Sequence, residues 1–122
     1  MSVRGIRGAI TIEVNEEQPI LDATSELLAD IVHANGIVPD DICSVLITVT
    51  NDLDATFPAR AIRTMAGWEL VPLMCALEVP VKGSLEKCIR LLVLVNTDKS
   101  QQEIEHIYLG RAQALRPDLA KS

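Results

Sequence analysis

The sequence has 122 residues, of which 48% are hydrophobic and 23% charged, so it can form one domain with a substantial core. Its net charge of −6 argues against nucleic-acid binding, which favours a basic surface for the phosphates. The longest apolar run, IRLLVLV, is too short to span a bilayer. We therefore expect a single domain over residues 1–122, with a tail after about residue 115 and no nucleic-acid or membrane partner.

The cysteines and histidines do not form a recognisable site. Cys43, Cys75 and Cys88 have no CxxC spacing, and His33 and His106 lie far apart in the sequence, so we expect no metal. The sequence has neither a P-loop nor a dinucleotide fingerprint, and we expect no cofactor. An odd number of thiols is typical of reduced cysteines in a cytoplasmic protein.

Residues 3–14, VRGIRGAITIEV, are predicted to form the first strand. In an extended chain, Ile6 and Ile10 share one face, while Arg7 and Ala9 share the other. The isoleucine face should contact the core. Arg7 then points away from the core, among residues with small side chains.

A long amphipathic helix follows over residues 16–36. Its apolar residues recur at helical spacing, Pro19 suits the first turn, and Gly36 is a natural C-terminal stop. We interpret His33 as an ordinary surface residue near the end of this helix.

The middle of the chain is predicted to hold a buried strand over residues 43–50 and a short helix over residues 58–67. Two further strands follow over residues 72–79 and 85–95. Lys82 and Gly83 lie in the connection between them, which predicts an antiparallel hairpin.

The last predicted element is a helix over residues 101–112. Ser100 and Glu103 have the spacing of a capping box, and the helix would carry Tyr108 on one side. By default such a tyrosine is a core residue with its hydroxyl at the rim. The order strand, helix, strand, helix, strand, strand, helix predicts an α/β (α+β) domain with a mixed sheet.

Among the charged residues of the predicted strands, Arg7, Glu78 and Arg90 are the ones that need an explanation. Ionised groups inside a sheet are unfavourable unless they are paired or face a ligand. A structural ion pair between Glu78 and Arg90 is one interpretation. The other is a site for a small polyanion, since one carboxylate cannot neutralise both Arg7 and Arg90, and arginine binds carboxylates with a bidentate fork.

Several segments together resemble the AroH-type monofunctional chorismate mutases. They are RGIRGA, DLDATFPARAIR, GWELVPLMC, EKCIR and HIYLGRAQALRPDL, and the resemblance covers nearly the whole chain. It implies a homotrimeric pseudo-α/β-barrel with helices on the outside and active sites between subunits. It also implies the isomerisation of chorismate to prephenate, on the route to phenylalanine and tyrosine.

The resemblance assigns roles residue by residue. Arg7 and Tyr108 match residues that bind substrate carboxylates, and Arg90 matches the arginine at the ether oxygen of the breaking bond. Glu78 matches the acid at the ring hydroxyl, with Cys75 beside it. The implied catalytic residues are Arg90, Glu78, Arg7 and Cys75, and the implied substrate-binding residues are Arg7, Phe57, Ala59, Arg60, Arg63, Met74, Cys75, Glu78, Arg90, Tyr108, Leu115 and Arg116.

Two other function classes use similar residues. A trimeric ligand-binding or deaminase-like protein would also bind a carboxylate with arginine, but it would need an acid that activates water. A regulatory module that binds an aromatic amino acid would use Glu78 and Arg90 as a structural pair.

Overall fold

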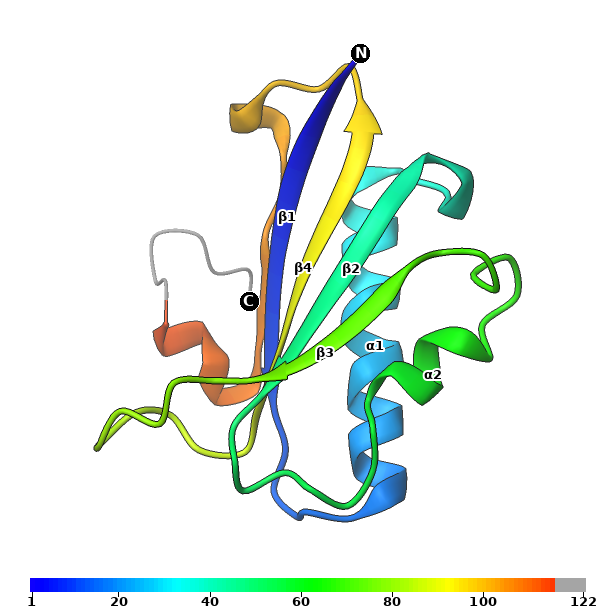
Figure 1. The fold of residues 1–122 in the computed structure, drawn as a ribbon. Helices are drawn as coiled ribbons and strands as arrows, with labels where there is room; N and C mark the ends of the chain where they lie inside the picture. Colours follow the sequence, from blue (N-terminus) through cyan, green and yellow to red (C-terminus); the bar gives the residue numbers. More distant parts are fainter. Residues whose placement is uncertain (116–122) are drawn as a thin grey trace.

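The computed structural model describes residues 1–115, and its centre is a five-stranded mixed sheet (Figure 1). The strands are β1 (Ser2–Thr11), β2 (Ile42–Val49), β3 (Leu73–Leu77), β4 (Cys88–Thr97) and β5 (Ile107–Leu109). The helices are α1 (Glu17–Asn35), α2 (Ala59–Arg63) and the 3₁₀ turns η1 (Pro39–Asp41), η2 (Gln101–Glu103) and η3 (Gly110–Ala114). The predicted fold class, a mixed sheet with helices, is confirmed.

The sheet has the order β3-β2-β4-β1-β5. β4 is antiparallel to both β1 and β2, whereas β3 runs parallel to β2 and β5 runs parallel to β1. The long strands β1, β2 and β4 therefore form the middle of the sheet, and the short strands β3 and β5 form its edges.

Helix α1 covers one face of the sheet (Figure 1). Its apolar stripe, which includes Leu27 and Ile31, is fully buried. Gly8 of β1 allows the close approach, because a Cβ there would lie 2.6 Å from Ile31 Cδ1. The helix ends as predicted at Gly36, which has a φ of 60°. The prediction for His33 is also confirmed, since its side chain is exposed.

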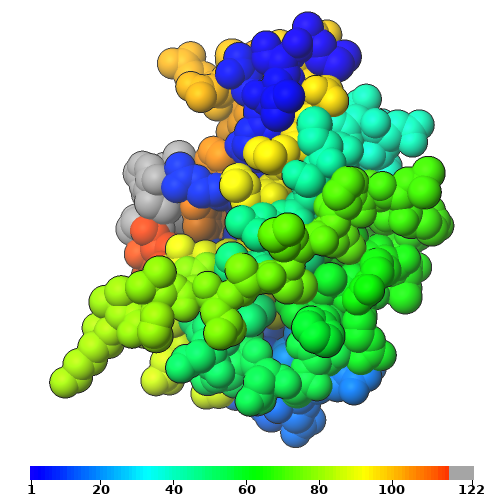
Figure 2. Space-filling view, in the orientation of Figure 1, coloured from blue at the N-terminus to red at the C-terminus, as the bar shows by residue number. Residues whose placement is uncertain are grey.

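The predicted hairpin between the third and fourth strands is wrong. β3 pairs with β2 instead, and β2 lies between β3 and β4. Two features explain the difference. The α2 segment lets the chain cross over from β2 and return parallel to it, and residues 78–87 form a connection much longer than a tight hairpin turn. This connection projects from the body of the molecule, as Figure 2 shows at the lower left.

The predicted C-terminal helix is also wrong. The Ser100–Glu103 capping box forms, but it begins only the single turn η2, and Tyr108 lies in β5. The open edge of β1 provides backbone partners for β5, and Ile107 is buried in the core. Gly110 then adopts a φ of 61°, which ends the strand in η3. Pairing with β1 overrides the local helical pattern.

Helix α2 is shorter than predicted and is followed by turns up to residue 71. Over residues 1–115, no helix combines the length and apolar content needed to cross a bilayer.

Candidate active site

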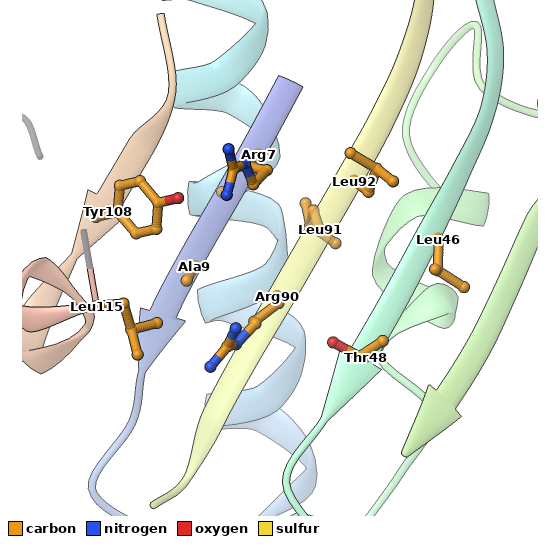
Figure 3. Close-up of a pocket in the computed structure, with 10 residues that line it drawn as sticks. Arg7, Ala9, Leu46, Thr48, Arg90, Leu91, Leu92, Tyr108 and Leu115 are labelled. Carbon is orange, nitrogen blue, oxygen red and sulfur yellow. The ribbon is translucent and has the colours of Figure 1, made fainter. Parts of the chain in front are cut away.

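The face of the sheet opposite α1 carries the polar residues of the site. Alternation along each strand produces this division: in β1 the buried Ile6 faces α1, and Arg7 faces away from it. In β2 and β4 the same alternation places Thr48 and Arg90 on the face that α1 leaves open (Figure 3). Thr48 is the direct register partner of Arg90.

A cavity of about 330 Å³ lies on this open face. Its lining includes Arg7, Ala9, Leu46, Thr48, Arg90, Leu92, Tyr108 and Leu115. The walls are thus largely aliphatic, and the charged groups in the lining are two guanidinium groups. A small apolar cavity with a few convergent polar groups is typical of a ligand site.

Arg7 and Tyr108 converge from neighbouring strands. The parallel pairing of β1 with β5 places Tyr108 beside Ala9, two residues beyond Arg7. The tyrosine hydroxyl is directed toward the Arg7 side chain (Figure 3). The backbone N–H of Arg7 donates to His106 Nδ1 at 2.9 Å, which joins the start of β5 to β1.

Arg90 lies beside Glu78, but the two form a loose pair. Arg90 Nε is 3.6 Å from Glu78 Oε2, beyond an ordinary hydrogen bond. The Thr48 hydroxyl donates to that same Glu78 Oε2. Arg90 Nε is buried and has no hydrogen-bond partner among the described residues. A buried donor without a hydrogen bond is unfavourable, so Glu78 does not fully satisfy the Arg90 guanidinium, whose side chain also lines the first cavity.

Cys88 lies two residues before Arg90 on β4, in a small buried cluster with Ala9, Tyr108 and Ala112. Burial raises the pKa of the Cys88 thiol, while the Arg90 guanidinium acts in the opposite direction. The thiol therefore packs as a neutral group, as a buried cysteine usually does.

Other predicted site residues line a second cavity, of about 580 Å³, between α2 and β3. Its lining includes Phe57, which is 67% exposed, as well as Arg60 and Cys75. Arg60 is already paired, because its Nη1 lies 2.8 Å from Glu17 Oε1. The two cavities share no lining residue.

The structure thus divides the predicted site into two halves. Arg7, Arg90, Tyr108 and Leu115 line the first cavity, with Glu78 beside Arg90. Cys75 packs against the core from β3, whereas Glu78 follows the end of β3 and lies beside Arg90. Among the remaining predicted residues, Ala59 is buried in the core, Arg63 is exposed at the end of α2, Met74 is exposed on β3, and Arg116 lies outside the described residues.

Sequence reasoning did not identify Thr48 as a site residue. The signal was a polar residue between the apolar Ile47 and Val49 in a strand. Thr48 lies beside Arg90 only because β2 pairs with β4. The predicted hairpin instead paired the third strand with the fourth. Within residues 1–115, no group of three or more His, Cys, Asp and Glu side chains could hold a metal ion.

The comparisons with known proteins agree with one another. The profile of the family described as chorismate mutase type I matches residues 3–119. The chain is 46% identical to the chorismate mutase AroH of Bacillus subtilis over 98% of this chain and 94% of that protein. It is 51% identical to that of Thermus thermophilus over 96% of each. A solved structure of a chorismate mutase from Clostridium thermocellum superposes with a TM-score of 0.88 at 49% identity, covering 91% of this chain and 98% of the other.

Proposed function

The chain belongs to the type I chorismate mutase family, which isomerises chorismate to prephenate in aromatic amino acid biosynthesis, and we propose how its residues perform this reaction. The observation that carries the proposal is the convergence of Arg7, Arg90 and Tyr108 on one cavity of about 330 Å³. Two guanidinium groups beside a single carboxylate, Glu78, leave a cationic excess that suits a dianion.

Chorismate has two carboxylates and an enolpyruvyl ether, and its conversion is an intramolecular [3,3] rearrangement through a chair-like transition state. The first requirement is to hold the substrate in the compact conformer in which the two reacting carbons approach each other. Arg7 and Tyr108 bind carboxylate in this proposal, while Leu92 and Leu115 of the cavity wall restrict the extended conformers.

The second requirement is electrostatic. Cleavage of the C–O bond runs ahead of formation of the C–C bond, so negative charge develops on the ether oxygen and positive charge on the ring fragment. In this proposal the Arg90 guanidinium donates to the ether oxygen and Glu78 faces the ring fragment; the loose geometry of the Arg90–Glu78 pair supports these roles. Fixed groups aimed at developing charge are usually the largest single contribution to catalysis. The reaction itself needs no proton transfer, so none of these residues has to act as an acid or base.

We also propose that the working site forms between subunits of a homotrimer. Each chain carries Arg7 and Arg90 in one cavity and Phe57 and Cys75 in another, which would provide the two walls of a shared cleft. In that arrangement Cys75 of one subunit would approach Glu78 of the next. Arg63, exposed on α2, would add positive charge at the mouth of the cleft.

The open face of the sheet supports assembly. Its side chains include Val3, which is 53% exposed, and Met74, which is 69% exposed, together with the partly exposed Leu46 and Leu92. Large exposed apolar residues in one area mark an interaction surface. Light scattering coupled to size-exclusion chromatography tests the trimer.

The three free cysteines support a reducing, cytoplasmic compartment.

The experiment that tests the catalytic proposal is incubation of the purified protein with chorismate. Loss of the ultraviolet absorbance of chorismate follows the reaction, and NMR of the product identifies prephenate. We expect rapid loss with the natural chain and a strongly slowed reaction with Arg7→Ala. Equal rates for the two proteins would contradict the role of the first cavity.

A further inference from the structure

Thr48 contacts Glu78, one of the proposed catalytic residues, but has no role in the proposed mechanism. It lies in β2 on the open face, is the register partner of Arg90, and lines the first cavity. A threonine is a common strand residue, and its hydroxyl needs no special explanation when it is solvated. Here, however, the hydroxyl donates to Glu78 Oε2.

The geometry of the Glu78–Arg90 pair is unusual for two such groups. A carboxylate beside a guanidinium frequently accepts two parallel N–H bonds. In this structure the nearest approach, from Arg90 Nε to Glu78 Oε2, is 3.6 Å, and that Nε has no hydrogen-bond partner among the described residues. The carboxylate oxygen that could satisfy it is the one that accepts from Thr48.

We propose that Thr48 is a positioning residue, which holds the Glu78 carboxylate away from Arg90 so that the Arg90 guanidinium, which lines the first cavity, stays available to the ligand. The inference rests on the proposed role of Arg90 and adds the group that maintains it. A guanidinium already paired with Glu78 would have to break that pair before it could bind the substrate. Thr48 prevents this loss by giving Glu78 another donor.

The first test replaces Thr48 with valine, which has nearly the same shape but no hydroxyl, and with serine, which keeps it. Thr48→Val should lower kcat/KM about tenfold or more, the scale of one hydrogen bond to a charged group, whereas Thr48→Ser should retain most of the activity. Thr97→Val, near the far end of β4, is the matched control and should behave as the natural chain does. Equal activity of Thr48→Val and Thr48→Ser, with both folded by circular dichroism, would overturn the proposal.

A double-mutant cycle with Glu78→Gln separates this role from simple packing. Glutamine cannot form the ion pair, so adding Thr48→Val to Glu78→Gln should change kcat/KM by less than about twofold. The same large loss in both backgrounds would show that Thr48 acts independently of Glu78, and the proposal would be wrong.

An NMR measurement tests the proposal without reference to turnover. The ¹⁵N–¹H resonance of Arg90 Nε, assigned by its loss in Arg90→Lys, reports whether the nitrogen is hydrogen-bonded. In the ligand-free Thr48→Val protein it should move downfield and exchange more slowly, because Glu78 then pairs with Arg90. An unchanged resonance would contradict the positioning role, even if the natural chain rearranged chorismate. Failure of the natural chain to rearrange chorismate would contradict only the proposed function.

Discussion

Replacement of Arg90 by lysine tests the electrostatic mechanism most directly. Lysine keeps the positive charge but loses the planar fork of N–H donors, including the buried Nε–H that has no hydrogen-bond partner among the described residues. If this fork faces the ether oxygen, its loss should raise the barrier by at least about 3 kcal/mol, the scale of a lost oxyanion donor. This increase corresponds to a decrease of roughly 150-fold in rate at 25 °C. Because the interaction strengthens in the transition state, the loss should appear mainly in kcat.

The assay follows chorismate absorbance over a range of substrate concentrations, with circular dichroism and thermal melting as checks of the fold. Arg4→Lys is the matched control, since Arg4 lies on β1 and its Nε donates to the Lys99 carbonyl oxygen at 3.0 Å, outside the cavity lining. This variant should keep nearly the full kcat. A kcat within a few-fold of the natural value in Arg90→Lys, or an equal loss in Arg4→Lys, would refute the assignment.

Four further predictions follow from the same structure. Mixing Arg90→Ala subunits with Cys75→Asp subunits, each inactive alone, should restore part of the activity because some clefts then have two intact walls; no recovery in verified mixed trimers would favour sites within one chain. The kcat should be nearly constant from about pH 6 to 9 with little solvent isotope effect, because arginine stays charged and no proton moves; a bell-shaped profile would argue for acid–base chemistry. Burial raises the pKa of the Cys88 thiol above its ordinary value, so its contribution to stability is complete below that ordinary value and is lost as the pH rises through the raised one; the drop in melting temperature between neutral and alkaline buffer should therefore shrink in Cys88→Ala. Gly8→Ala should destabilise the fold by about 1–3 kcal/mol in urea titrations, because the new Cβ would lie 2.6 Å from Ile31 Cδ1.

The faces of the long elements could be predicted from local patterns. The alternation in the first strand correctly placed Ile6 toward the core and Arg7 on the opposite face. The helical spacing of the second element and its stop at Gly36 are also confirmed. These features depend on neighbours within a few residues, so a single sequence contains the information for them.

The partners of each strand could not be predicted in the same way. The apolar segments around Cys75 and Arg90 were predicted to pair as a hairpin because they are close in sequence. In the structure β2 lies between them. The segment around Tyr108 has a helical pattern but pairs with the open edge of β1. Backbone pairing between distant segments decides both cases, and local propensity is a weak guide to it.

By itself, then, the sequence determined the residue types of the site, the resemblance that gives the family, and the side of β1 from which Arg7 projects. Only the tertiary structure decided that the Thr48 hydroxyl donates to Glu78 beside Arg90, and that Cys75 lines a cavity that Glu78 of the same chain does not line. The physical reason is that the order and register of the sheet decide which side chains of β2, β3 and β4 become neighbours. That order is fixed by which faces can be buried together against α1, a property of the whole chain rather than of any segment.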